Sequence, residues 1–296
     1  MTSMTPELNP KSSKAKARSP FQDSLRTFRK SKLAVIGTII VVFFILLAIF
    51  GPLIAPQGIN EQNFKLKLQS PSSEFWFGTD VFGRDIFSRV VLGSRLSLMV
   101  GFASVAISII VGSILGILAG YYGRWVDTII SRFFDILLAF PSILLAIAIV
   151  TALGPSLFNA LLAIAIVNVP NFGRLIRSKV LSIKEEEFIT AAKAIGMKDS
   201  RILFTHVLPN SMTPIIVQGT LAIATAIIEA AALGFLGLGA QAPAPEWGKM
   251  LSDARVYLVN APWTMIFPGL AIMLTVLGFN LMGDGLRDAF DPKMKN

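Results

Sequence analysis

Five long stretches of this sequence contain no Asp, Glu, Lys or Arg. A helix that crosses the hydrocarbon core of a membrane needs about 20 mostly apolar residues. The stretch 136–173 is long enough for two such helices, and Gly154-Pro155-Ser156 near its middle is a turn signal. The sequence therefore predicts six membrane-spanning helices, at 33–54, 98–120, 134–153, 157–173, 214–237 and 263–283.

The composition favours an all-α polytopic membrane protein. Charged residues make up 15% of the chain, whereas soluble domains average about 25%. The chain has no Cys and one His, His206, so disulfides, iron–sulfur clusters and a clustered zinc site are excluded. It also lacks a phosphate-binding G-x-x-x-x-G-K-[ST] loop. We expect no catalytic residues and no metal or cofactor bound by this chain.

The positive charges predict the orientation in the membrane. Six spans place both termini on one side, and 20 of the 27 Lys and Arg residues fall on that side. By the positive-inside rule, both termini are cytoplasmic. A cleaved signal peptide is disfavoured, because the basic segment 1–32 and the apolar segment 33–54 are both too long. Residues 1–24 are expected to form a disordered basic tail.

Small residues recur every four positions in two of the predicted helices, which allows close helix packing. We favour packing within the chain for both stripes, with a subunit contact as the alternative. Pro141, Pro262 and Pro268 are expected to begin or bend helices. The stripes consist of Ser104, Ser108, Gly112, Gly116 and Gly120, and of Ala222, Ala226, Ala230 and Gly234.

Glu229 is the one acidic residue deep within a predicted span. A carboxylate at that depth is costly unless it is paired or hydrated. It could face a translocation path and contact a charged group of the solute. It could equally make a structural hydrogen bond to a neighbouring helix or to the backbone, and the sequence does not separate the two.

The segment 174–213 is a long, charged cytoplasmic loop. Glu185, Glu186 and Glu187 suit the start of a helix, and Gly196 suits its end. A second short helix is expected from Asp199 or Ser200 to Val207, ended by Leu208-Pro209. The first helix could lie along the lipid surface or dock in a groove of a soluble partner. Its expected apolar face is Phe188, Ala191, Ala192 and Ile195.

This loop resembles the coupling loop of bacterial ABC importer permeases. The pattern Thr190-Ala191-Ala192-x-x-x-Gly196, followed by His206-Val-Leu208-Pro209, matches the spacing of that family's EAA motif. Thr190 replaces the usual Glu, and His206 replaces the usual Ile. A DNA-binding helix–turn–helix is disfavoured, because the segment lies between two spans.

Three further stretches are similar to the oligopeptide, dipeptide and nickel branch of that family. Phe77 to Arg95 looks like the segment before its second helix, and Glu229 to Gly248 like its fifth helix end and external loop. Residues 25–60 resemble the extra N-terminal helix of its C-type subunit. The resemblance implies a MetI-like fold with four parts: a tail at 1–24, a first-helix segment at 25–70, an extracytoplasmic segment at 71–97 and a transmembrane domain at 98–290.

The resemblance also implies a function and partners. The chain would be the pore-forming permease of an ATP-driven importer of peptides in the cytoplasmic membrane of a bacterium or archaeon. Its partners would be a homologous second permease, two ATPase subunits that bind ATP and Mg, and an extracytoplasmic binding protein. Nickel or another small solute is the alternative cargo, and an ion-coupled carrier is the rival class. The docking contacts would be Ala191, Ala192, Gly196 and Leu208, with Arg201 at the rim.

Paired charges precede the second predicted helix, namely Asp80, Arg84, Asp85 and Arg89. They could contact the binding protein or brace the outer end of that helix. We favour bracing, because clusters of Asp and Arg often serve local structure.

Overall fold

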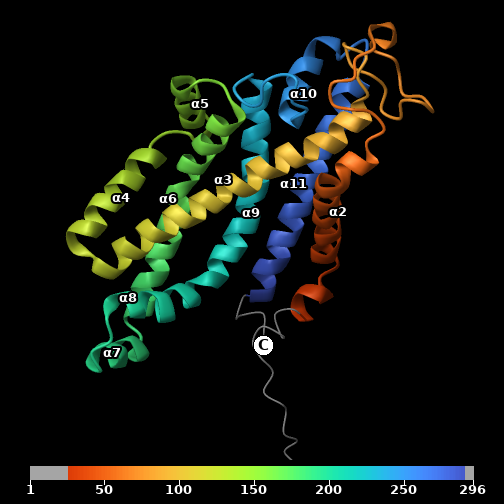
Figure 1. Cartoon of the computed structure of the whole chain (residues 1–296). Coiled ribbons are helices and arrows are strands. Elements are labelled where there is room, and N and C mark those ends of the chain that lie inside the picture. The colour runs from red at the N-terminus through yellow and green to blue at the C-terminus, as the bar shows by residue number, and fades with distance from the viewer. Residues whose placement is uncertain (1–25, 291–296) are drawn as a thin grey trace, which may run out of the picture.

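The computed structural model describes residues 26–290, and every regular element in that range is a helix (Figure 1). Five helices are long and apolar enough to cross a membrane, and a bent pair makes a sixth crossing if counted as one span. The predicted all-α fold is confirmed for the described residues, whereas the expected tail at 1–24 lies outside them. The helices are α2 Lys32–Ile54, α3 Ile86–Tyr122, α4 Arg124–Leu138, α5 Ser142–Leu153, α6 Leu157–Lys184, α7 Glu187–Ala194, α8 Asp199–Ile202, α9 Leu208–Phe235, α10 Trp247–Ala254 and α11 Trp263–Phe290.

Helix α3 begins twelve residues before the predicted span at 98–120. Its first turn is capped by Asp85, whose carboxylate accepts hydrogen bonds from the backbone N–H groups of Phe87 (3.3 Å) and Ser88 (2.8 Å). The prediction placed the start too late because Arg89 and Arg95 interrupt the uncharged stretch. Arg89 is nevertheless only 3% exposed, since protein groups surround it.

The small-residue stripe of α3 packs on α6 within this chain. A side chain at Gly112 would meet the Val169 carbonyl at 2.7 Å, and one at Gly116 would overlap the carbonyl of Gly173. One turn before Gly112 on the same stripe, Ser108 donates a hydrogen bond to the Ala165 carbonyl at 2.9 Å. These contacts confirm packing within the chain for this stripe. The second stripe, on α9, is likewise buried within the chain.

The third predicted span, 134–153, is wrong as a single helix. The chain instead forms α4 and α5, which meet at an angle of 92° across a break at 139–141. Pro141 lies at the start of α5, as expected of a residue that cannot continue a helix. The prediction began too late because Asp127, Arg132 and Asp135 charge one face of α4. Arg177 and Arg174 of α6 pair with Asp127 and Asp135.

Helix α6 continues to Lys184, eleven residues beyond the predicted end at 173. Asn168, Pro170 and Asn171 do not stop it. Asn168 donates to the Ile164 carbonyl at 3.0 Å, inside the helix. Pro170 is itself buried against other helices, and such tertiary packing outweighs the helix-breaking tendency of these residues.

The predicted helix end at Leu208-Pro209 is also wrong. A π-helical segment, Leu203–Val207, joins α8 directly to α9, and Pro209 lies in the first turn of α9. The N–H of Leu208 donates to the carbonyl of Leu203, five residues earlier. This wider turn precedes the proline ring, which lacks an N–H and would clash with a regular α-helical carbonyl. The chain therefore bends here without ending the helix.

Helix α2 packs tightly on α11. A side chain at Gly37 would meet Met282 and Leu281 at 2.7 Å, and Gly285 lies directly against Ala34. Gly278 faces Ile40 of α2 in the same way. These glycines let the two backbones approach closely, so the first helix belongs to the same bundle as the rest.

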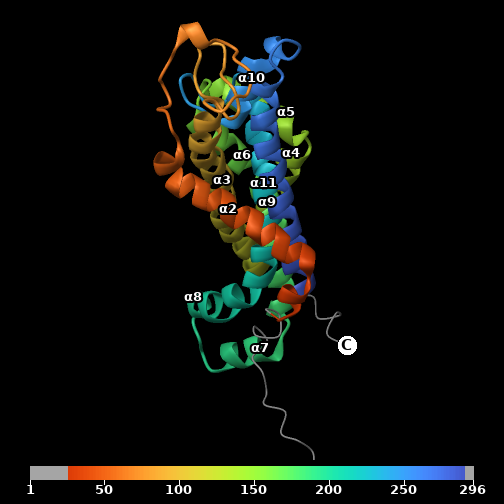
Figure 2. The same ribbon diagram turned by 90° about the vertical axis from the view of Figure 1, so that its right-hand side faces the viewer.

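The described chain begins and ends at the same end of the bundle, where α7 and α8 also lie (Figures 1 and 2). The segment between α2 and α3, together with α10, covers the opposite end. We call these the α7–α8 end and the α10 end. This arrangement agrees with an even number of crossings, while the side of the membrane that each end faces stays a prediction from the positive-inside rule.

Candidate functional site

The loop at the α7–α8 end is a small folded unit. Ile189 and Ala192 of α7 are buried against Ile202, Val207 and residues of α6. Helix α7 ends as predicted: Gly196 has φ +80°, and its N–H donates to the Lys193 carbonyl at 2.9 Å. The predicted helix–turn–helix is present, with its second part continuing into α9.

The predicted apolar face of α7 is mostly open. Phe188 is 43% exposed, Ile195 is 78% exposed and Ala191 is exposed, whereas Ala192 is buried. Ile189 takes the inward position that the predicted stripe did not include. The face centred on Phe188, Ala191 and Ile195 is therefore free in this chain, and burial within the loop does not account for it.

The remaining predicted coupling residues lie at the same end of the molecule as this open face. Thr190 and Pro209 are exposed, and the His206 ring lies 5.9 Å from that of Phe188. Leu208 lines an apolar groove beside α3. Arg201 lines a shallow pocket of about 350 Å³ next to Gly196. The structure thus brings these residues to one end of the molecule, and their docking role stays a prediction.

Sequence reasoning missed the anchor of this loop. The Tyr121 hydroxyl, at the end of α3, donates a hydrogen bond to Asp199 at 2.6 Å. Lys184 donates to the Tyr121 carbonyl at 3.0 Å, and the Lys193 ammonium lies 5.5 Å from the centre of the Tyr121 ring. The tandem Tyr121-Tyr122 at the end of an uncharged stretch was a visible signal. The loop is consequently tied to the end of the longest helix.

At the α10 end, the four paired charges serve local structure. Asp80 accepts hydrogen bonds from the backbone N–H groups of Phe82 (2.8 Å) and Arg84 (3.0 Å) and from the Arg84 side chain (2.6 Å). Arg89 donates to the carbonyls of Ile59 (3.1 Å) and Pro243 (3.4 Å). Asp85 caps α3. This geometry favours the bracing role, although a contact with a partner stays untested.

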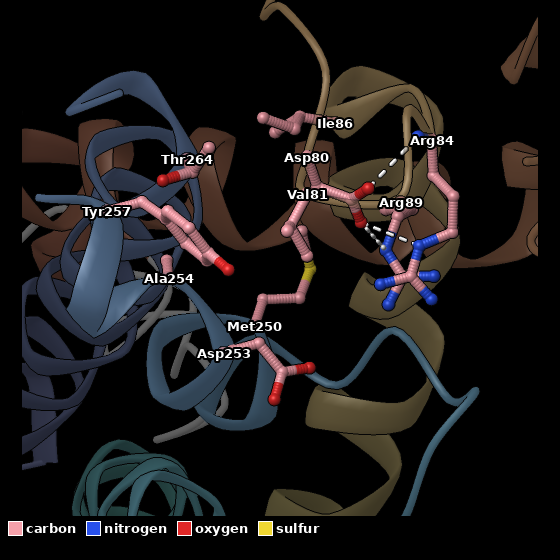
Figure 3. A pocket seen from close by; sticks show the side chains of 10 residues that line it. All are labelled: Asp80, Val81, Arg84, Ile86, Arg89, Met250, Asp253, Ala254, Tyr257 and Thr264. Atoms are coloured by element: carbon pink, nitrogen blue, oxygen red, sulfur yellow. Dashed lines mark hydrogen bonds and ion pairs between the residues drawn. The ribbon is translucent and has the colours of Figure 1, made fainter. Parts of the chain in front are cut away.

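These charges border a small pocket. Figure 3 shows the guanidinium groups of Arg84 and Arg89 next to the Asp80 carboxylate, with Asp253 of α10 across from them. The pocket measures about 30 Å³, room for no more than a water or two. The pocket therefore lies between α10 and the turn before α3, and it is too small to hold a solute.

Glu246 is a second residue that sequence reasoning missed. It is 2% exposed and accepts hydrogen bonds from the N–H groups of Gly248 and Lys249, both at 2.8 Å. The Trp247 indole donates to the Val90 carbonyl at 3.0 Å. Burial raises the pKa of Glu246 above its ordinary value, against the opposing effect of these backbone bonds. Nothing in the local sequence around Glu246 singles this residue out.

Glu229 is bonded within the chain. It is 9% exposed, and its carboxylate accepts a hydrogen bond from Asn168 of α6 at 3.2 Å. This hydrogen bond joins α9 to α6. This geometry agrees with the structural alternative, and a transport role stays a prediction.

The sequence of this chain matches two known protein families. Residues 112–296 match the family described as the binding-protein-dependent transport system inner membrane component. The chain belongs to this family. Residues 19–71 also match the N-terminal transmembrane domain of oligopeptide transport permease C. The chain is thus an inner-membrane permease component, and the rival assignment to ion-coupled carriers is wrong.

Curated relatives span the chain. A dipeptide transport system permease protein, DppC, of Alkalihalophilus pseudofirmus is 65% identical, covering 99% of this chain and 97% of the relative. A di/tripeptide permease, DppC, of Pseudomonas aeruginosa is 47% identical over 94% of each chain. A glutathione permease, GsiD, of Escherichia coli strain 536 is 48% identical, covering 94% of this chain and 92% of the relative.

A solved structure supports the predicted MetI-like fold. An inward-facing form of the MetNI methionine ABC transporter aligns with a TM-score of 0.54 and 19% identity, covering 70% of this permease and 98% of that chain. At this identity the likeness concerns the fold alone.

Proposed function

We propose that this permease forms the pore of an ATP-driven importer of dipeptides and tripeptides. The observation that carries the proposal is the 65% identity, over nearly the whole of both chains, to a dipeptide transport permease. The di/tripeptide relative supports the same class of solute. Nickel, the alternative drawn from the sequence, has no comparable support among these relatives.

The open face of α7 is proposed to dock into the ATPase subunits. Phe188 and Ile195 present apolar surface at one end of the bundle. Beside them lies the pocket next to Gly196, which Lys198 and Arg201 also line. A soluble partner would remove this surface from water. Two ATPases would bind ATP and Mg²⁺ and carry out hydrolysis, while this chain would take no part in the chemistry. The α7–α8 end would accordingly be cytoplasmic, in line with the excess of Lys and Arg there.

The remaining partners are proposed from the family. A homologous second permease would complete the pore as a heterodimer, and a binding protein would deliver the peptide at the α10 end. The family's own description names a binding-protein-dependent system. Selectivity among peptides would then depend on the binding protein more than on this chain.

The test is uptake by the reconstituted system. Proteoliposomes with both permeases and both ATPases, given the binding protein and ATP, are expected to accumulate a radiolabelled dipeptide. Omitting ATP or the binding protein should abolish accumulation. Gradient-driven transport by this chain alone, or ATP-driven uptake that ignores dipeptides, would contradict the proposal.

Glutathione is a second candidate because GsiD is 48% identical to this chain. Glutathione is a modified tripeptide, so the two candidates share a chemical class. Excess unlabelled glutathione should compete poorly with a labelled dipeptide if the first proposal holds. Strong competition by glutathione, and weak competition by other dipeptides, would favour the second.

A further inference from the structure

An apolar groove lies beside α3, where the π-helical segment Leu203–Val207 meets α9. Its volume is about 420 Å³, and sites for small molecules commonly measure about 300–1,000 Å³. Six residues of α3, two of the π-helical segment and three of α9 line it. All of them are apolar except Ser113 of α3. Such a lining, with a single polar group, is typical of a site for an apolar ligand.

The groove is open on the outside of the bundle. Ile110 and Ile114 of α3 and Phe204 of the π-helical segment are exposed in this chain. Ser113 precedes Tyr122, the last residue of α3, by nine residues, which is about 14 Å along the helix axis. Because α3 runs obliquely across the bundle (Figure 1), the depth of Ser113 from the α7–α8 end is smaller than this length. The groove therefore lies near one edge of the hydrocarbon core.

The hydroxyl of Ser113 has no hydrogen-bond partner among the described residues 26–290. Ser113 is 7% exposed, and its Oγ bonds to no other group there. Ser104 and Ser108 of the same helix instead donate to the carbonyls four residues earlier, at 2.7 and 2.8 Å. Buried polar groups in proteins are nearly always hydrogen-bonded. The Ser113 hydroxyl therefore points to an acceptor that a ligand in the groove supplies.

Two other occupants do not suit this lining. A buried water needs about two to four polar partners, and the groove offers one hydroxyl. A peptide carries charged ends and a polar backbone, and burying those groups without partners is costly. Ten of the eleven lining side chains are apolar, so they cannot supply such partners. The groove suits an apolar chain that carries an oxygen acceptor, and it is no path for the cargo.

We propose that this groove binds one acyl chain of a membrane phospholipid, and that the ester carbonyl of this chain accepts a hydrogen bond from Ser113. Ester groups lie where the hydrocarbon core meets the headgroups, about 15 Å from the middle of the bilayer. This depth agrees with the position of Ser113 near one edge of the core. The apolar part of the chain continues along Ile110, towards the middle of the membrane. One lipid thus contacts α3, the π-helical segment and α9 together, whatever the cargo of the permease.

The test is photo-crosslinking of the complete transporter, purified with its partner subunits in detergent. The probes are two phosphatidylcholines that carry a diazirine on one acyl chain. One has ester linkages, and the other has ether linkages and therefore lacks the carbonyl. Trypsin releases α3 within peptide 96–124 and α2, whose exposed side chains are also apolar, within peptide 33–65. Mass spectrometry gives the lipid concentration at which each peptide is half-labelled, and fragmentation locates the adducts.

In the wild type, the ester lipid is expected to half-label peptide 96–124 at a concentration about tenfold lower than peptide 33–65, because a groove contacts a chain on several sides. Ser113→Ala should raise that concentration about fivefold for the ester lipid, the usual effect of losing one hydrogen bond, and leave the ether lipid unchanged. Ile114→Trp fills the groove and should abolish the preference. Met99→Trp enlarges an exposed residue of α3 outside the groove and is the control.

Half-labelling of the two wild-type peptides at the same concentration would overturn the proposal, as would an equal effect of Ser113→Ala on the ester and ether lipids. Protection of peptide 96–124 from both probes would mean that a partner subunit covers the groove, which also overturns it. Ser113→Ala removes a hydroxyl that bonds to nothing among residues 26–290, so this variant is expected to fold normally. The readout involves no transport, and failure of dipeptide uptake would therefore contradict the proposed function alone.

Discussion

At the scale of single residues, buried charges in this permease act mainly on their own backbone. Asp85 caps α3, Asp80 holds the turn before it, and Glu246 caps α10. The sequence indicated the first two through their Asp and Arg pattern. It did not indicate Glu246, because that position depends on Gly234 of α9, where any side chain would overlap the carboxylate. Such an approach between distant segments leaves no local signal.

Replacing Glu246 is expected to loosen α10. Glu246→Gln loses one of the two capping acceptors but also removes a charge that burial disfavours, so near neutral pH it should change the free energy of unfolding little. The matched variant Glu246→Ala loses both acceptors and should cost more. Thermal unfolding in detergent would measure both, and equal stability of Glu246→Gln, Glu246→Ala and wild type would contradict the capping role.

The stability contribution of Glu246 is also expected to depend on pH. Its pKa in the folded protein lies above the ordinary value of 4.5, so folding favours the protonated form. The contribution is therefore present below pH 4.5 and is lost as the pH rises through the folded pKa. Wild type should lose more stability between pH 5 and pH 8 than Glu246→Gln. An identical loss in the two proteins would contradict the shift.

Gly196 offers a test of docking that separates strain from contact. Any side chain at φ +80° is strained by about 1 kcal/mol, but no atom of this chain lies within 4 Å of the added Cβ. Gly196→Ala and Gly196→Trp therefore share the strain, and only the Trp ring reaches outwards. We expect Gly196→Trp to uncouple ATP hydrolysis from uptake. Gly196→Ala is expected to retain most of the ATP-driven uptake. Gly123, also at positive φ with open space, supplies Gly123→Trp as a control.

At the scale of elements, the sequence predicted which segments are helices better than where they break. The uncharged stretches located α2, α3, α6, α9 and α11. They failed for α4, because its charged face is matched by α6: Arg177 lies 2.7 Å from Asp127, and Arg174 lies 2.7 Å from Asp135. A count of charges along one segment cannot anticipate partners on another.

Glu229 is expected to stabilise the contact between α9 and α6. Glu229→Gln keeps an acceptor for Asn168 and should retain both yield and uptake. Glu229→Ala removes the acceptor that the buried Asn168 amide uses on α9, at a cost of about 1–3 kcal/mol, and should lower the yield of folded protein. Quantitative immunoblots and uptake assays would separate the two roles. Normal yield with no uptake in Glu229→Gln would establish a transport role instead.

The α3–α6 contact should tolerate no added atom. A methyl group at Gly116 would overlap the backbone of Gly173, which cannot move aside without parting the helices. Gly116→Ala is expected to lower stability by about 1–3 kcal/mol, measured as thermal unfolding in detergent. Ala106→Val, which enlarges an exposed residue on the same helix, is the control and should have little effect.

At the scale of the whole molecule, the two ends of the permease differ in net charge and in how their charged side chains are bonded. The α7–α8 end carries the excess of Lys and Arg, while the α10 end carries paired charges that are bonded internally. The sequence predicted the first property by counting. It could not predict how the second end is closed, because the pairs Arg89–Pro243 and Trp247–Val90 join segments more than 150 residues apart.

One helix also connects the two ends mechanically. Helix α3 has 37 residues, begins in the Asp85 turn and ends at the tyrosine that holds the loop through Asp199. A straight helix of 37 residues is about 55 Å long. If α3 moves as a rigid body, a tilt of about 5° about one end displaces the other end by about 5 Å. A displacement of α8 would therefore move the segment that covers the α10 end directly, without a series of side-chain rearrangements across the membrane.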